Sequence, residues 1–563
     1  MLDFRSEIKK LLTNIIHLNL SRIFPEKTPP DNFNKNILVE KPQRLEHGDF
    51  ASGISMMLAR IYKNPPRSIA EYIKKEIESK NPDFISKVEV AGAGYLNFFL
   101  NNKIWKKILA EIVHLDNDYG KSSNEHKMNI QIEFVSANPT GPMNVVNARA
   151  AALGDTLANF LKIAGHNVTK EYYINDSGVQ INNLGLSVEA RMRELLGEIV
   201  EFPENGYHGD YIKDISEKLL KYIGKDIWDK EPEKRLNIIK EKSLNMMVAD
   251  QKNQLKNYGV TYDIWFSERS LHEKKALENT LDILGEKDRT FKKDGALWLK
   301  TSDFGDEKDR VLVKEDGQPT YFLGDIAYHI DKFERNFDLI IDILGPDHHG
   351  HGIRMKAAME ALGFDPDKLM ILIAQQVNLK KDGRNIKMSK RAGEFVTLDE
   401  LVQEVGKDAA RFFFLMRKAE SHLDFDIDLA KKTSNDNPVY YIQYAYARIS
   451  SILKKAMEQG IVIDDHPDDS VLSKLDLQNE IEIIKKLYDY RDMIDKCVIL
   501  YEPQRISTYL IELAGMFHSY YNANRIISDD PDLTSARLYM VRGIIVVLRN
   551  ALTIMGINTP ESM

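Results

Sequence analysis

The stretch NIQIEFVSANPTGP, residues 129–142, decides the fold of this chain. Ile130, Ile132 and Phe134 alternate with polar residues, which is the pattern of a half-buried strand. A turn-rich segment, a long helical pattern and a second β-type run, HNVTKEYYI, follow in that order. Strand, loop, helix and strand in succession predict a βαβ unit with a parallel sheet.

The same rhythm is interrupted further along the chain and then returns. Residues from about 185 to 290 carry charge-rich helical patterns, which we interpret as an insertion. The strand DLIIDILG, the helix GIRMKAAMEALG and the strand KLMILIAQQVNL come next. Beyond residue 432 only amphipathic helical patterns remain.

These patterns predict an α/β fold class with three domains in 563 residues. Residues 1–118 indicate a small α+β accessory domain. Residues 119–432 indicate a Rossmann-like domain built on a parallel sheet and split by the insertion. Residues 433–563 indicate an all-α domain of ordinary size.

Composition limits the compartment and the kind of protein. The net charge of −8 suits a soluble protein and does not exclude nucleic acid, because basic patches can lie on an acidic whole. Cys497 is the one cysteine, so no internal disulfide and no cysteine-rich zinc site can form. The N-terminus lacks the pattern of a signal peptide, and the apolar run Ile544–Leu548 is far shorter than the roughly 20 residues of a membrane span. We therefore expect a soluble, cytoplasmic protein.

Two segments carry patterns of anion chemistry. The loop SANPTGP lies between a strand and a helix, where helix N-terminal amides hold phosphate or carboxylate groups. The string KMSKRAG, residues 387–393, is a basic loop suited to a polyphosphate. Taken singly, the first is more often a rigid capped turn and the second a solvated charge run. Their occurrence in two halves of one split α/β sheet favours phosphate binding.

Several motifs in the expected order resemble the arginyl-tRNA synthetases, a family of class I aminoacyl-tRNA synthetases. The motifs are SANPTGP, EYYINDSG, GDIAYH, GPDHHGH, KMSKRAG, NPVYYIQYAYAR and HSYYNANR, and the resemblance covers essentially the whole chain. It implies a class I synthetase-type catalytic domain, an all-α anticodon-binding domain and an N-terminal domain that contacts the tRNA elbow. The implied reaction activates arginine with ATP and transfers it to the 3′-terminal adenosine of tRNA(Arg).

The resemblance also implies which residues form the sites. A guanidinium and an ammonium require carboxylates and polar groups. Tyr321 and Asp325 are four residues apart, on one helical face, and Asp325 is expected to select the guanidinium. The expected arginine-binding residues are Glu133, Asn138, Tyr321 and Asp325. The expected ATP-binding residues are Ser136, Pro139, Thr140, Gly141, Asp347, His348, His351, Met388 and Ser389. The expected catalytic residues are Asn144, Asn147, Lys387 and Lys390.

One motif departs from the family pattern. Class I synthetases carry His-x-Gly-His at the start of the helix, where this chain has Asn144-Val145-Val146-Asn147. Asparagine can donate hydrogen bonds to phosphate but cannot become cationic. We expect the two asparagines to act as neutral donors, with Lys387 and Lys390 carrying the charge. A catalytically silent tRNA-binding or regulatory paralogue is the alternative.

The C-terminal helical patterns suggest an RNA-binding surface. Tyr441, Tyr444 and Arg448 fall on one helical face and could form a stacking platform beside a cation. A helical core explains the spacing of these aromatic residues equally well, and the family resemblance favours the RNA reading. His518, Tyr521, Asn522 and Arg525 leave the same two readings open.

The string GPDHHGH also suggests a metal site, since it places Asp347, His348, His349 and His351 close together. It lacks the spaced partners of a closed zinc site, so we expect no tightly bound metal. A metal-dependent hydrolase is the weaker rival. The expected cofactor is ATP with Mg²⁺ as the substrate complex, and the expected partners are tRNA(Arg), arginine and ATP, without a membrane and with the protein as a monomer.

Overall fold

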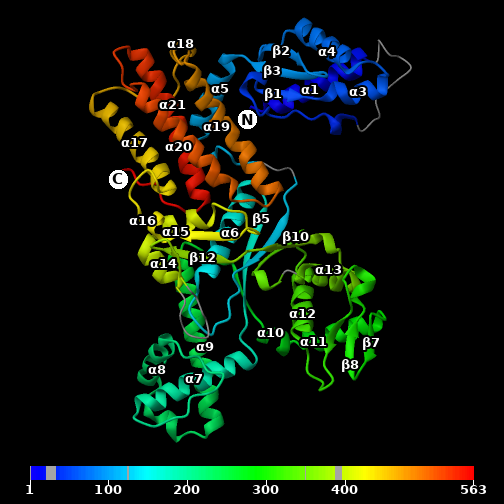
Figure 1. The fold of residues 1–563 in the computed structure, drawn as a ribbon, viewed down its shortest axis with the longest axis vertical. Coiled ribbons are helices and arrows are strands. Elements are labelled where there is room, and N and C mark those ends of the chain that lie inside the picture. The colour runs from blue at the N-terminus through cyan, green and yellow to red at the C-terminus, as the bar shows by residue number, and fades with distance from the viewer. Residues whose placement is uncertain (1, 21–32, 123–125, 349, 387–395) are drawn as a thin grey trace. The chain divides into compact units, whose positions relative to one another are not determined.

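The computed structural model describes residues 2–20, 33–122, 126–348, 350–386 and 396–563 (Figure 1). The chain forms two compact units. The first comprises Met1–Tyr119, Ile449–Asp489 and Met516–Val547, and the second comprises Gly120–Arg448, Tyr490–Gly515 and Leu548–Met563. None of the described helices is long and apolar enough to cross a membrane.

The first unit contains a small antiparallel sheet with the strand order β1-β3-β2. Leu96 and Phe98 of β3 are fully buried, as are Leu58 and Ile73 from the helices α3 and α4. The N-terminal segment is therefore an α+β structure. Its elements are α1 Phe4–Ile15, η1 Ile16–Leu20, η2 Phe33–Asn36, η3 Leu45–His47, β1 Phe50–Ser52, α3 Ile54–Tyr62, α4 Pro66–Lys80, β2 Ile85–Ala91, β3 Tyr95–Leu100, α5 Asn102–Leu115 and η4 Asp116–Asp118.

The described chain after residue 432 contains only helices, as its sequence pattern predicts. Several helices run from one unit into the other, because their residues are divided between the two ranges given above. The helices are α17 Pro438–Glu458, α18 Asp469–Leu472, α19 Gln478–Ile499, α20 Arg505–Ala523 and α21 Pro531–Ile554.

The second unit is built on a five-stranded sheet with the order β11-β10-β4-β5-β6, in which every pairing is parallel. The predicted parallel sheet is thereby confirmed. Ile132 of β4 and Ile340 and Ile341 of β10 are fully buried, which explains their apolar character. The strands are β4 Asn129–Phe134, β5 Asn167–Ile174, β6 Ile264–Ser267, β10 Leu339–Leu344 and β11 Leu369–Ile373.

Helix α6, Val145–Ile163, joins β4 to β5 and packs closely on the sheet. Its alanine-rich first turns favour helix. A Cβ atom at Gly154 would lie 2.2 Å from Cγ of Phe134, so only glycine allows this approach between α6 and β4. The middle of α6 is thus held close to the end of β4.

The helical insertion predicted for 185–290 contains a strand that the sequence pattern missed. Helices α7 Val179–Leu195, α8 Asp210–Ile223 and α9 Pro232–Asn257 share their own apolar core. However, β6 at 264–267 pairs in parallel with β5 and forms an edge of the main sheet. Four residues are too few to show alternation, and only pairing with a distant strand defines them. The remaining elements here are η5 Lys225–Asp229, α10 Arg269–Glu273 and α11 Ala276–Glu286.

The segments that follow also form two smaller sheets. GALWLK and RVLVKEDG belong to an antiparallel sheet with the order β7-β8-β9, and the predicted strand KLMILIAQQVNL is two strands, β11 and β12, in different sheets. The other elements are β7 Thr290–Lys293, β8 Ala296–Leu299, η6 Thr301–Phe304, β9 Arg310–Val313, α12 Tyr321–Glu334, η7 Pro346–His348, α13 His351–Leu362, η8 Pro366–Lys368, β12 Val377–Lys381, β13 Arg384–Asn385, α14 Leu398–Val405, α15 Lys407–Phe414, β14 Leu423–Asp426 and α16 Ile427–Lys431.

Candidate active site

The motifs after β4 and β10 meet at the carboxyl edge of the parallel sheet. These strands are neighbours, and the chain continues from β4 into α6 and from β10 into η7 and α13. Strands β5 and β6 lie on one side of β4, whereas β10 and β11 lie on the other. Open α/β sheets bind ligands at such a switch point.

The loop after β4 begins with a strained turn. Val135 and Ser136 have φ angles of 73° and 39°, in the region that favours glycine. Such residues cost about 1–3 kcal/mol each and persist only where their surroundings hold them. The Ser136 hydroxyl helps to hold this turn in place. It donates to Glu133 Oε1 over 2.7 Å and accepts from the Tyr173 amide over 3.1 Å.

The backbone of this loop is held by two helices of the insertion. Gln251 of α9 donates from Nε2 to the carbonyls of Asn138 and Gly141, each over 3.2 Å. The Tyr211 hydroxyl of α8 donates to the Thr140 carbonyl over 2.7 Å. The loop therefore has a defined shape, in which Pro139 and Thr140 are buried and the side chain of Asn138 is exposed.

The two asparagines at the start of α6 form a capping box. Asn144 Oδ1 accepts from the amides of Val146 and Asn147, while Asn147 Oδ1 accepts from the Asn144 amide over 3.1 Å. Both side-chain oxygens are therefore occupied by the backbone. Within the described residues, neither side-chain amide group donates a hydrogen bond, so both remain able to donate to a ligand.

The basic KMSK string lies outside the described residues, so the structure says nothing of Lys387, Met388, Ser389 and Lys390. The structure does describe the residues before and after this string. The β12 and β13 strands pair before it, and Thr397 after it pairs with Asn144 at the start of α6. Thr397, two residues after the stretch that lies outside the described residues, thus lies beside the start of α6.

A cluster of carboxylates surrounds Tyr173 beside this loop. Burial raises the pKa of the Tyr173 hydroxyl, and the charges of Glu268, Asp325, Glu133 and Asp176 raise it further. Four acidic side chains from β4, α12 and the segments after β5 and β6 therefore lie close enough to Tyr173 to raise its pKa. A cationic ligand would relieve their mutual repulsion.

Asp325 lies on α12 in this cluster, as its predicted role requires. Its side chain keeps 43% of its exposure, so a ligand can reach it, yet burial and the charges of Glu133 and Glu268 raise its pKa to about 7. Tyr321, one turn earlier, is 80% exposed. Sequence spacing placed these two residues correctly on one helix.

His351, at the first position of α13, lies beside the carboxylate of Asp325. Its Nε2 is 3.8 Å from Asp325 Oδ2, and its ring centroid is 5.6 Å from that of His348. Burial and the nearby His329 and His348 lower the pKa of His351 to about 4. His351 is therefore neutral near pH 7 and does not form an ion pair with Asp325.

The structure describes only part of the histidine string. His349 is outside the described residues, and Asp347 and His348 lie in the short helix η7. Among the residues that the structure does describe, no group of three or more His, Cys, Asp and Glu side chains could hold a metal ion.

Sequence reasoning missed Glu268 and Tyr173 as members of the acidic cluster. Glu268 follows β6, the strand hidden within the predicted helical insertion, so no pattern pointed to it. Asp176 accepts from Ser267 Oγ over 2.5 Å and from the Arg269 amide over 2.9 Å. It therefore fixes the turn after β6 that carries Glu268.

The aromatic residues of α17 are arranged differently from their predicted spacing. Tyr440, rather than Tyr441, stacks with Tyr444, with ring centroids 6.0 Å apart and planes 17° apart. Arg448 lies 4.4 Å from the Tyr444 ring and donates to its hydroxyl over 2.6 Å. Tyr441 instead lies near Gly515 of α20. The platform thus follows i, i+4 spacing.

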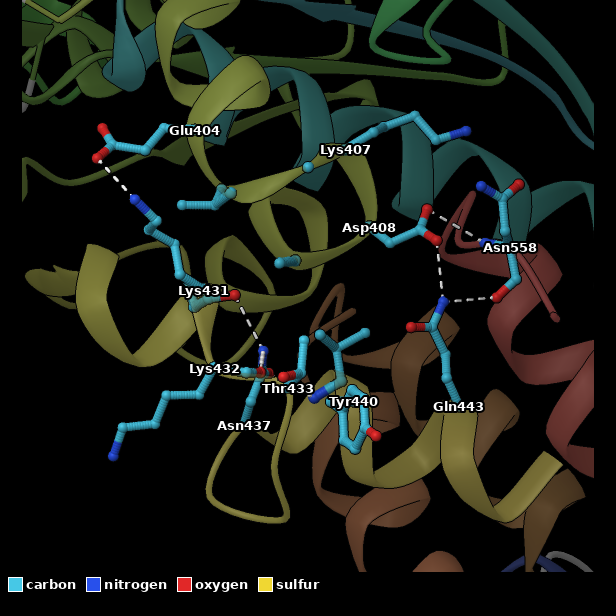
Figure 2. A pocket seen from close by; sticks show the side chains of 15 residues that line it. Glu404, Lys407, Asp408, Lys431, Lys432, Thr433, Asn437, Tyr440, Gln443 and Asn558 are labelled. Atoms are coloured by element: carbon cyan, nitrogen blue, oxygen red, sulfur yellow. Dashed lines mark hydrogen bonds and ion pairs between the residues drawn. The ribbon is translucent and has the colours of Figure 1, made fainter. Parts of the chain in front are cut away.

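A cavity of about 370 Å³ lies next to this platform, and Tyr440 lines it (Figure 2). Figure 2 shows Gln443 bridging Asp408 and Asn558, donating to the Asp408 carboxylate over 2.9 Å and to the Asn558 carbonyl over 3.0 Å. Lys431 and Lys432 also line the cavity, and they form ion pairs with Glu404 and Asp436 respectively.

Comparison with protein families matches three successive parts of the chain. The family model “Arginyl tRNA synthetase N terminal domain” matches residues 4–100, and “tRNA synthetases class I (R), catalytic domain” matches residues 108–424. “DALR anticodon binding domain” matches residues 442–563. The predicted class I fold, with an N-terminal domain and a helical C-terminal domain, is confirmed.

Individual relatives are similar to this chain over nearly its full length. The chain is 45% identical to an Arginine--tRNA ligase of Desulforamulus reducens over 94% of each chain, and 43% identical to that of Syntrophotalea carbinolica over 99% and 100%. A solved structure titled a putative arginyl t-RNA synthetase from Campylobacter jejuni is 36% identical, with a TM-score of 0.76 over 82% of this chain and 100% of that one. The arginyl-tRNA synthetase of Thermus thermophilus shares the fold, with a TM-score of 0.76 over the whole of both chains at 21% identity. The chain belongs to the arginyl-tRNA synthetase family.

Proposed function

We propose that this protein joins arginine to tRNA(Arg) in two steps at the carboxyl edge of the parallel sheet. The arginine carboxylate attacks the α-phosphate of ATP, forming arginyl-adenylate and releasing pyrophosphate. A hydroxyl of the 3′-terminal adenosine then attacks the activated carbonyl and releases AMP. The observation that carries the proposal is the cluster of carboxylates around Tyr173, next to a strand–loop–helix unit of class I type.

The arginine site follows from charge. Asp325 and Tyr321 bind the guanidinium, and Glu133 and Asn138 bind the amino-acid end. A guanidinium offers a planar set of donors that matches a carboxylate, so it lowers the free energy of the ionised Asp325. In the free protein no guanidinium is bound, so the ionised Asp325 is less favourable and its pKa is raised.

The ATP site lies at the start of α6 and α13. The loop residues Ser136, Pro139, Thr140 and Gly141 hold the nucleotide with Asp347, His348 and His351, and Met388 and Ser389 contribute from the basic string. Asn144 and Asn147 donate to the phosphates through side-chain amide groups that the capping box leaves available. Lys387 and Lys390 supply the charge, and Mg²⁺ accompanies ATP as part of the substrate. Catalysis is by positioning and electrostatic stabilisation, without a covalent nucleophile.

The tRNA contacts lie in both terminal domains. The helical domain, residues 433–563, binds the anticodon loop through the stacked Tyr440 and Tyr444 and through Arg448, with Tyr440 in place of the Tyr441 expected from the sequence, since unpaired bases are bound by stacking. The domain of residues 1–118 contacts the tRNA elbow, and residues 119–432 carry the chemistry. We place the protein in the cytoplasm as a monomer.

The decisive experiment is arginine charging of total tRNA by the purified protein with Mg-ATP. Wild type is expected to charge tRNA, and Asp325→Ala is expected not to. The relatives lend no support to the silent-paralogue alternative. A wild-type protein that binds tRNA without charging it would nevertheless establish that alternative.

A further inference from the structure

A row of three carboxylates crosses the middle of the parallel sheet. Asp342 of β10 is in register with Glu133 of β4, which is in register with Glu171 of β5. In-register residues of parallel strands project from the same face of the sheet. Lys332 of α12 and Arg335, which follows it, meet this row from the helix side.

Lys332 joins two of the three carboxylates. Its ammonium lies 2.5 Å from Glu133 Oε2 and 2.6 Å from Asp342 Oδ1, and its side chain is fully buried. His329 Nε2 lies 2.8 Å from the other oxygen of Asp342. Burial lowers the pKa of Lys332, but Asp342 and Glu133 raise it more, so Lys332 keeps its charge.

Glu133 is consequently held through both of its oxygens. Oε1 accepts from Ser136, and Oε2 accepts from Lys332 and from the Tyr328 hydroxyl over 2.9 Å. Only 9% of its side chain is exposed. An ionised carboxylate in such a place requires a cation, because without one it takes up a proton or turns away.

We propose that Lys332 is a positioning residue, which orients Glu133 for the ammonium group of the amino-acid substrate. The inference rests on the proposed function, in which Glu133 binds that ammonium. Lys332 itself touches no substrate. Its charge also lowers the pKa of Asp325, but its direct contact is with Glu133, so we expect the main effect at the amino end of the ligand.

The test compares two ligands that differ only in the α-amino group, L-arginine and 5-guanidinopentanoate. Binding is measured by calorimetry with tRNA(Arg) and α,β-methylene-ATP present, which blocks adenylate formation. Wild type should favour L-arginine by about tenfold to a hundredfold, the range for a hydrogen bond to a charged group. In Lys332→Met the preference should fall to within about twofold, with weaker binding of L-arginine and little change for the analogue.

Two further variants separate positioning from general damage. Arg335, directly after α12, forms an ion pair with Glu171 of the same row of carboxylates, over 2.6 Å. Arg335→Met removes this pair and should keep the wild-type preference for L-arginine. Lys332→Met/Asp342→Asn removes one charge of each sign, which buried pairs often tolerate. If Lys332→Met alone does not fold, the double variant serves in its place, because we expect it to fold. It should also lose the preference for L-arginine.

The outcomes are distinguishable. A folded Lys332 variant that retains the wild-type preference, or that weakens both ligands equally, overturns the positioning role. If the wild-type protein charges tRNA, either of these results overturns the role of Lys332 but leaves the proposed function intact. A wild type that neither charges tRNA nor prefers L-arginine overturns the proposed function and this inference with it.

Discussion

Asn144 and Asn147 exchange hydrogen bonds across the first turn of α6, with Asn147 Oδ1 accepting from the Asn144 amide over 3.1 Å. The pair therefore stabilises the helix start and presents two neutral donors at the same point. In the proposed role, the pair would hydrogen-bond the phosphates without supplying a cationic charge, because an asparagine amide stays neutral.

Asn147→Asp separates these two roles. Aspartate keeps the acceptor of the capping box but replaces the amide donor with a negative charge. The melting temperature should stay close to wild type, while pyrophosphate exchange should slow about a hundredfold or more, the usual effect of losing a transition-state donor. Asn147→Ala should lose about 1 kcal/mol of stability as well.

Asn101→Ala is the control for the cap, since Asn101 caps α5 through the Lys103 amide in the other unit. It should lose comparable stability and keep its exchange rate. An Asn147→Asp protein with unchanged activity would remove the donor role.

The affinity for arginine should depend on pH through Asp325. With a pKa of about 7 in the free protein, the carboxyl must lose a proton before it binds a guanidinium at lower pH. Affinity should therefore rise about tenfold between pH 5 and pH 6 and level off above about pH 8. Titration calorimetry across this range measures it, and Asp325→Asn should abolish the pH dependence along with most of the affinity.

Asp325 should also make the stability of the free protein depend on pH, but here ionisation is unfavourable, whereas it favours arginine binding. The pKa of Asp325 is raised on folding, so its contribution to stability is present below about pH 4 and is lost as pH rises through 7. Asp325→Asn without ligand should therefore melt above wild type at pH 8. This advantage should shrink as the pH falls toward 4. An equal gap at both pH values would contradict the raised pKa.

Gln251 should affect ATP through the shape of the loop. Gln251→Met removes both bonds to the carbonyls of Asn138 and Gly141 and should raise the KM for ATP more than the KM for arginine. Loss of these two partly buried hydrogen bonds should also cost about 1–3 kcal/mol of stability. Ser243→Ala on the same helix removes a hydroxyl that donates to the Ile239 carbonyl within that helix, and it should leave both KM values unchanged.

The platform on α17 makes Tyr440 a test of RNA binding. Tyr440 lines the cavity and stacks on Tyr444, so Tyr440→Ala should weaken tRNA binding about fivefold to a hundredfold, the range for one stacked base. Tyr441→Phe, which keeps its ring near Gly515, should bind tRNA normally in a filter assay. Equal loss in both variants would indicate damage to the helix.

Much of the fold followed from short-range pattern. Alternation in β4, the apolar runs of β5 and β10 and the helical period of α13 each reflect one element packing on one face. The family motifs likewise placed Asp325 and Tyr321 on one helix, because four residues span one helical turn. The short strand β6 carried no such period.

The sequence by itself determined the order of elements, the class of the fold and the segments that carry chemistry, because these depend on neighbours within a few residues. Tertiary structure alone decided that Glu268 joins the acidic cluster, that Lys332 joins Glu133 to Asp342, and that Tyr440 stacks on Tyr444 while Tyr441 turns to α20. Glu133 and Lys332 are 199 residues apart. Only the pairing of distant strands and the packing of α12 on them bring such charges together, and no local pattern records that pairing.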